Sequence, residues 1–304
     1  RQRQEDHLSF LVMKNPYIIP SLIIAGAILG GFWLLKQPRG TQKVLIVAPL
    51  KEITIHQAAK NNDINAIQLQ LSKGVDINLR GESGKTALTI ACLKKHTKLA
   101  EQLINKGANN IISQGGFTPL HFASSSGSYK VAKLLINKNF NLNVMDYTGG
   151  TPLDSASGKL KSESPETKES KKKIAALLTK NGGKRGYELS MVIAARNGEI
   201  DAVKHFLNKG TDINTSYTGM ARFPGIPPSQ YTSLHWAAHS GNIEIAELLI
   251  SSGANINKKD SKGLTPLDKS RNIYEWESTK QRANKKYVGN LILKHGGKTG
   301  AELK

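Results

Sequence analysis

The sequence predicts an all-α solenoid of short helix-turn-helix repeats, preceded by one transmembrane helix. A unit of two short helical patterns recurs along the chain from residue 51, and residues 17–35 contain no charged side chain. Aromatic residues make up only 6% of the chain and there is one cysteine, so Leu, Ile, Ala and Val must fill the core without a disulfide framework. We divide the chain into an N-terminal tail (1–16), a transmembrane helix (17–35), a tether (36–50), a first block of four repeats (51–189) and a second block of three (190–304).

The uncharged run at 17–35 fits a membrane span. As a helix with a rise of 1.5 Å per residue it reaches about 28 Å, which matches the hydrocarbon thickness of a bilayer. The residues after it read LLKQPRG and lack a small-residue cleavage site, which favours a retained anchor over a cleaved signal peptide. The flank after the span carries Lys36, Arg39, Lys43 and Lys51, against Arg1, Arg3 and Lys14 before it, which favours a cytoplasmic repeat domain. We therefore expect a single-pass membrane protein, while the opposite orientation stays open.

The repeated unit is clearest in residues 232–257. It contains two apolar patterns at helical spacing, separated by a break at Gly241 and ended by Gly253. Neither helix is long enough to be stable alone in water. Each has one broad apolar stripe that a single unit cannot cover, so neighbouring units must bury it.

Similar units begin at regular intervals along the chain. Their first residues are Ile53, Thr86, Thr118, Thr151, Leu189, Thr232 and Thr265. The pattern TPLH with a small-residue pair, then a mid-unit Gly, an L-L-I run and G-A-N-I-N, resembles the ankyrin repeat at its period of 33 residues. This resemblance covers residues 51 to 304 and implies an ankyrin-repeat solenoid of about seven repeats, which recognises proteins without catalysis.

The array looks duplicated. The first block ends with GGKRGYEL (182–189) and the second with GGKTGAEL (296–303), and the last unit of each block has ten extra residues between its two helices. The extra segment 159–173 is rich in Lys, Glu and Ser, so we expect a solvated loop. Because no flexible linker separates the blocks, we favour one continuous stack over two separate stacks.

No catalytic, cofactor or metal site is expected. GESGKT at 81–86 resembles a phosphate-binding loop, but Leu79 stands where that loop needs glycine. His235 and His239 are four residues apart without a third ligand, and the resemblance gives His235 a structural role, hydrogen bonding to neighbouring turn backbone. Cys92 occupies a small-residue position of the repeat, so we interpret it as core filling. We find no set of a nucleophile, a base and an orienting group, and predict that the protein is not an enzyme.

The formal net charge of +20 indicates attraction to an acidic partner. Acidic proteins, an anionic membrane surface and nucleic acid all fit this charge. We do not expect nucleic acid, because no aromatic-interleaved basic motif or nucleic-acid module is present. The predicted function is a membrane-tethered scaffold for protein-protein interaction. The alternatives are a basic surface that binds nucleic acid or anionic membrane, and a non-catalytic accessory subunit of an enzyme.

The predicted partner-binding residues lie on the turns and the outer part of each first helix. One turn, between Asn214 and Tyr231, is expanded by ten residues and contains aromatic, arginine and proline residues. Tyr, Trp and Arg are the residues that interface hot spots favour. The predicted set is Phe117, Tyr147, Arg196, Tyr217, Arg222, Phe223, Tyr231, Trp236 and His239. The alternative is that Trp236 and Phe223 only pack between repeats.

Overall fold

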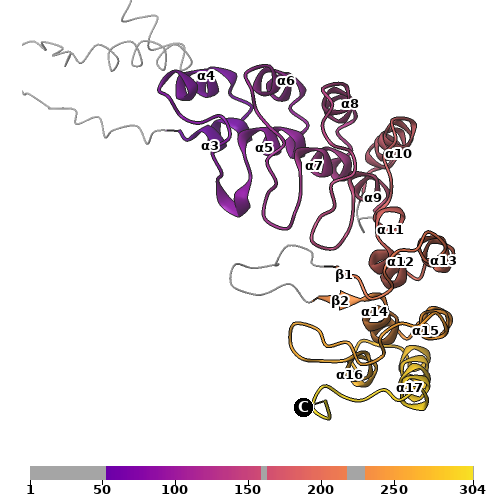
Figure 1. The fold of residues 1–304 in the computed structure, drawn as a ribbon. Coiled ribbons are helices and arrows are strands. Elements are labelled where there is room, and N and C mark those ends of the chain that lie inside the picture. The colour runs from indigo at the N-terminus through magenta and orange to yellow at the C-terminus, as the bar shows by residue number, and fades with distance from the viewer. Residues whose placement is uncertain (1–52, 159–162, 218–229, 304) are drawn as a thin grey trace, which may run out of the picture. The chain divides into compact units, whose positions relative to one another are not determined.

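The computed structural model describes residues 53–158, 163–217 and 230–303, all within one compact unit. Successive helices in it form antiparallel pairs, each with a first and a second helix (Figure 1). In the first block the pairs are α3 (Ile55–Lys60) with α4 (Ile64–Ser72), α5 (Ala87–Lys94) with α6 (Thr97–Asn105), α7 (Pro119–Ser126) with α8 (Tyr129–Asn137), and α9 (Pro152–Ser157) with α10 (Pro165–Lys180). In the second block they are α12 (Met191–Asn197) with α13 (Ile200–Asn208), α14 (Ser233–Ser240) with α15 (Ile243–Ser251), and α16 (Pro266–Arg271) with α17 (Thr279–Lys294). A helical ankyrin-type fold is therefore confirmed, while the number of repeats stays a prediction.

The first helices begin and end at residues that suit helix termini. Thr118 and Thr232 are N-caps, and each takes part in a capping box with the histidine three residues later. The same two helices end at Gly127 and Gly241, whose φ angles of 70° and 69° lie in the left-handed region that favours glycine. Gly241 also lies against the backbone of Lys285 in α17, so a side chain there would have little room.

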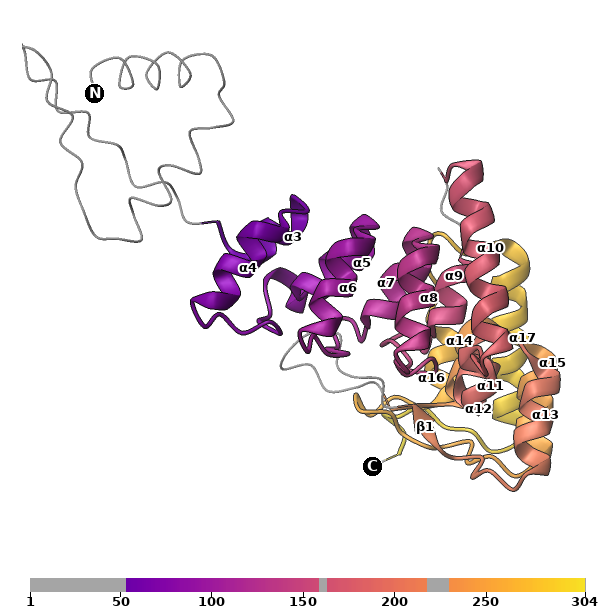
Figure 2. The same cartoon turned by 90° about the horizontal axis from the view of Figure 1, so that it is seen from above.

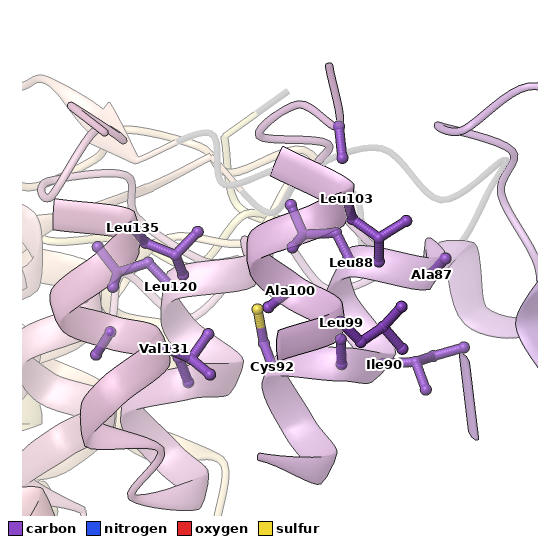
Figure 3. Packing of buried hydrophobic residues seen from close by; sticks show 14 of the residues in the cluster. Ala87, Leu88, Ile90, Cys92, Leu99, Ala100, Leu103, Leu120, Val131 and Leu135 are labelled. Atoms are coloured by element: carbon purple, nitrogen blue, oxygen red, sulfur yellow. The ribbon is translucent and has the colours of Figure 1, made fainter. Parts of the chain in front are cut away.

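The core lies between the layer of first helices and the layer of second helices. Figure 3 shows Leu88, Leu99 and Leu103 of one pair beside Leu120 and Leu135 of the next. All five side chains are fully buried. Cys92 lies in the same cluster, and burial raises the pKa of its thiol, so its interpretation as core filling is confirmed.

The hydrophobic core is divided between the two blocks. One cluster runs from Ile55 to Leu178 and the other from Met191 to Ile292. Between them lies the short helix α11 (Gly186–Leu189), and α9 and α12 do not pack side by side as α7 and α9 do. The expected continuous stack is therefore interrupted at its core.

Hydrogen bonds and apolar contacts connect the blocks at this interruption. Arg196 Nη1 donates to the carbonyl oxygen of Thr148, and Tyr217 Oη donates to that of Asp146 at 2.8 Å. Ile193 packs on Gly149 so closely that no side chain would fit there. Tyr187 of α11 also packs against the second core cluster, so both polar and apolar contacts connect the blocks.

The expected solvated loop at 159–173 is wrong over most of its length. α10 begins at Pro165, and both α10 and α17 are long second helices of 16 residues (Figure 2). Lys171 is only 3% exposed, and its Nζ lies 2.7 Å from Glu163 Oε1 and donates to the carbonyl oxygen of Gly158. A lysine can be buried in this way because its apolar stem packs while its ammonium group is paired. Residues 159–162 lie outside the described residues.

The predicted membrane localisation needs a correction. Among the helices that the structure describes, none is long and apolar enough to cross a membrane, which contradicts the predicted single-pass protein. The predicted span itself, residues 17–35, lies outside the described residues.

Candidate recognition surface

Five aromatic side chains form a continuous row on the second block. They come from the strand β2 (Tyr231–Thr232), from α14 and from the loop between α16 and α17. The row is Tyr231, Trp236, His239, Tyr274 and Trp276, and consecutive ring centroids lie 5.1, 5.6, 5.7 and 5.3 Å apart. The first three contacts are tilted or edge-on and the last is stacked at 16°, which are arrangements that aromatic pairs prefer.

Two cationic side chains extend this row. The guanidinium carbon of Arg196 lies 5.0 Å from the ring centroid of Trp236, and Lys269 Nζ lies 4.4 Å from that of Tyr231. Both distances are within the range of cation–π attraction. We call these seven residues the aromatic strip: Arg196, Tyr231, Trp236, His239, Lys269, Tyr274 and Trp276.

Side chains of α17 hold the loop that carries Tyr274 and Trp276. Lys285 is fully buried, and its Nζ donates to Glu277 Oε1 at 2.8 Å and to the carbonyl oxygen of Asn272. The same ammonium lies 5.2 Å from the ring centroid of Tyr274. Arg282 adds hydrogen bonds of 3.2 and 3.0 Å to the carbonyl oxygens of Tyr274 and Glu275. The loop is thus held from both of its ends.

Burial and nearby charges set the protonation of the strip. Burial, followed by the positive charge of Lys285, lowers the pKa of His239, so its imidazole is neutral at physiological pH. Burial of Asp260 acts to raise its pKa, but the hydrogen bond from Lys269 and the backbone hydrogen bonds from Leu264 and Lys262 together outweigh burial and lower it. The ion pair between Lys269 and Asp260, with N···O at 2.7 Å, therefore keeps both partners charged.

The strip gathers four of the nine residues predicted from sequence: Arg196, Tyr231, Trp236 and His239. Phe117 packs on Phe122 at 5.6 Å in the first block, away from them. The backbone of Tyr147 bonds to Gly115, and Tyr217 bonds to Asp146, so both contribute to contacts between turns. Tyr217 also ends the strand β1 (Ser216–Tyr217), which pairs with β2 at the base of the expanded turn. Arg222 and Phe223 lie outside the described residues.

Sequence reasoning missed Lys269, Tyr274 and Trp276. Tyr274 and Trp276 lie between two helices, and repeat spacing alone gives no position there. Trp276 is the most exposed large apolar side chain of the described residues, at 72%. Two aromatic residues inside a polar insertion were the available signal, because a solvated loop does not need them.

His235 has a structural role, as the resemblance implied. Its Nδ1 lies 2.8 Å from Thr232 Oγ1 and its Nε2 lies 3.2 Å from the carbonyl oxygen of Leu264 in the next turn. Burial lowers its pKa to about 4. Across the described ranges, no group of three His, Cys, Asp or Glu side chains is placed to hold a metal ion.

Five of the seven strip residues lie on the second of two copies of one unit. The first copy (residues 118–188) and the second copy (residues 232–302) repeat the same hydrogen bonds 114 positions apart. His121 Nε2 lies 3.2 Å from the carbonyl oxygen of Gly150, as His235 does from that of Leu264. Thr151 and Thr265 each donate to a tail carbonyl oxygen at 2.7 Å. The residues that form these bonds between turns are thus equivalent in the two copies.

Comparison with known proteins agrees with this architecture. A family profile described as ankyrin repeats (3 copies) matches residues 55–158 and 168–270, which is more than half of the chain. The human transient receptor potential cation channel subfamily A member 1 is 26% identical over 272 residues, covering 78% of this chain and 20% of the channel. The ankyrin repeat and SOCS box protein 11 of Danio rerio is 36% identical over 100 residues, covering 33% of this chain and 34% of that protein.

A third relative is the neurogenic locus notch homolog protein 1 of Xenopus tropicalis. It is 27% identical over 218 residues, which cover 64% of this chain and 8% of that protein. The chain therefore spans about a third or less of the length of these relatives. Ankyrin repeats are generally protein-interaction scaffolds and generally non-catalytic. On the match of the family profile, the chain belongs to the ankyrin-repeat family.

Proposed function

We propose that this protein is a non-catalytic scaffold that binds a protein partner through the aromatic strip. Each residue of the strip comes from a first helix, a turn or the loop after a first helix, and every strip side chain except that of the buried Lys269 is at least partly exposed to a partner. Trp, Tyr and Arg dominate interface hot spots because they bury a large area with a polar end. The strip combines these residue types within one row of touching rings.

The observation that carries this proposal is the difference between the two copies. Phe122, Ser125 and Ser155 of the first copy stand where the second copy has Trp236, His239 and Lys269, and Phe117 just before the first copy corresponds to Tyr231 just before the second. Both copies retain the same capping boxes and the same bonds between turns. The first copy folds without the hydroxyl of Tyr231, the indole of Trp236 and the imidazole of His239, and a binding role accounts for these groups.

The exposure of Trp276 supports the same function. With 72% of its surface in water, it contributes little to the core, although its ring stacks on Tyr274. Covering this ring on binding removes a large apolar area from water. A true hot spot of this kind contributes roughly 2 kcal/mol or more to binding, which is about a 30-fold change in affinity.

Site-specific photo-crosslinking from the strip tests the proposal. A photoreactive amino acid at Glu275, which is exposed between the two outer rings, should crosslink a protein partner that mass spectrometry can identify. Trp276→Ala should then lower the affinity for that partner at least tenfold while the thermal unfolding midpoint stays unchanged. The proposal fails if folded Trp276→Ala binds the crosslinked partner as tightly as the unaltered chain.

Tyr287→Ala is the matched control. Tyr287 is also an exposed aromatic residue, at 50%, but it lies on α17 and bonds to Glu247 of α15, outside the strip. Its replacement should leave the affinity unchanged. Equal losses for both variants would indicate a general effect of exposed aromatic area and would contradict a site centred on the strip.

A further inference from the structure

A groove at the other end of the array is lined by residues of α3 and α5. Figure 1 shows these two helices as neighbours in the first block. The turn that connects the two pairs forms its third wall, where the 3-10 helix η1 (Glu82–Gly84) lies. Its volume is about 530 Å³. Ile90 and Leu93 supply its apolar lining, and Leu93 is 38% exposed. A groove of this size accommodates a few side chains of an extended or helical segment.

Three lysines line this groove. They are Lys60 at the end of α3, Lys85 before α5 and Lys94 at the end of α5. None of the three forms an ion pair with a residue in the described part of the chain, where the ion pairs involve residues from Asp154 onward. Glu82 is the one carboxylate among the lining residues. The groove therefore carries a net positive charge over an apolar floor.

We propose that this groove binds an acidic, amphipathic segment of a protein partner. An apolar side chain of the segment packs on Ile90 and Leu93, and its flanking carboxylates pair with Lys60, Lys85 and Lys94. Charge complementarity of this kind fixes register and accelerates association. The groove is a second recognition surface, and it stands or falls independently of the aromatic strip.

The chemistry of the lining favours a protein segment over nucleic acid. Single-stranded nucleic acid is bound through aromatic side chains on which bases stack, together with cations that contact phosphates. His56 supplies the one ring of the lining, and its Nε2 is already bonded to the carbonyl oxygen of Leu79 at 2.9 Å. An apolar floor without a free stacking ring matches an aliphatic side chain better than a base.

Selection from a random peptide-display library tests the proposal with the full 304-residue chain. We expect the selected peptides to combine Asp or Glu with Leu, Ile, Val or Phe. A synthetic peptide of the selected sequence should bind at least tenfold more weakly to the triple variant Lys60→Gln, Lys85→Gln, Lys94→Gln. Leu93→Ser should weaken binding at low and high salt alike, because it removes an apolar contact.

The matched control removes the same charge elsewhere. Lys98, Lys106 and Lys133 are exposed on or at the end of second helices, outside the groove. Their triple replacement by Gln should leave peptide affinity within about twofold, and the circular dichroism of both triple variants should match that of the unaltered chain. Selected peptides without acidic enrichment, or equal losses in the two triple variants, would overturn the proposal.

Two further probes distinguish other occupants. Single-stranded oligouridylate and vesicles containing phosphatidylserine should bind no more weakly to the groove variant than to the control variant. If either probe binds the unaltered chain tightly and loses affinity only in the groove variant, the groove is a phosphate site and the proposal is wrong. Changes in the strip, such as Trp276→Ala, should leave peptide binding intact, so that the two surfaces fail separately.

Discussion

The two copies at 118–188 and 232–302 share a polar framework and differ at their surfaces. In both, a buried histidine joins one turn to the next, and a buried lysine pairs with a glutamate beneath the long insertion. Yet Phe122 of the first copy corresponds to Trp236 of the second, and Ser125 corresponds to His239. This comparison teaches that the fold keeps the buried histidine and lysine contacts in both copies, while partly exposed positions of the first helix differ between the copies.

Replacement of the buried lysines should have the largest effect on stability, and it should be similar in the two copies. Lys285→Met leaves Glu277 buried without its partner and should lower the free energy of unfolding by about 3 to 5 kcal/mol. Lys171→Met should have a similar effect, because Lys171 and Glu163 are paired in the same manner. Urea unfolding of both variants measures the losses.

A double replacement separates charge burial from packing. If the penalty is the unpaired charge, Lys285→Met with Glu277→Leu should recover most of the lost stability, since apolar replacements of buried ion pairs are often neutral. A double variant as unstable as the single one would show instead that the bond to Asn272 dominates.

Truncation of a buried leucine in one core cluster should destabilise mainly the block that contains that cluster. Leu135 and Leu249 are both fully buried, in different core clusters. Leu249→Ala should cost about 2 to 5 kcal/mol and increase hydrogen exchange mainly in the second block, because each repeat contacts only its neighbours. Leu135→Ala should do the same in the first block. Leu248, which apolar spacing also marks, is only half-buried and should cost less. Exchange that rises equally in both blocks would contradict the divided core.

The buried histidines make stability fall in mild acid. The pKa of His235 in the folded state is about 4, below the ordinary value of about 6.5, so the unfolded chain takes up a proton first as pH falls. The contribution is complete above pH ~6.5 and is lost towards pH ~4, on the order of 3 kcal/mol for His235. Burial also lowers the pKa of His121, so both copies should respond alike. Titration of the ring protons by NMR measures both values, and a pKa of His235 near 6.5 would contradict the prediction.

Exchange of surface residues between the copies should have the smallest effect on stability. Trp236→Phe gives the second copy the residue of the first, and Trp276→Ala removes an exposed ring. Each should change the unfolding free energy by less than about 1 kcal/mol, because such surface positions rarely matter to the fold. Calorimetry measures the change. A larger loss for Trp276→Ala would mean that its stacking on Tyr274 holds the loop, which would weaken its assignment to recognition.

Much of the fold could be predicted from the sequence because the repeat is local. Thr118 and Thr232 mark helix starts, Gly127 and Gly241 mark helix ends, and apolar spacing marks the buried faces. The role of His235 also followed from the repeat. The 159–173 segment could not be predicted correctly, because its composition is that of a solvated loop while burial of Lys171 depends on a glutamate brought close by folding.

The sequence by itself determined the family, the helix pairs and four members of the strip, since these depend on spacing within about 33 residues. Only the tertiary structure decided which aromatic residues touch. Tyr274 and Trp276 join His239 because Lys285, from a different helix, holds their loop against α14. The tertiary structure also decided that Lys60, Lys85 and Lys94 line one groove, because its walls come from two repeats and the turn between them. Contacts between side chains far apart in sequence depend on how the helices pack, and periodicity does not encode that packing.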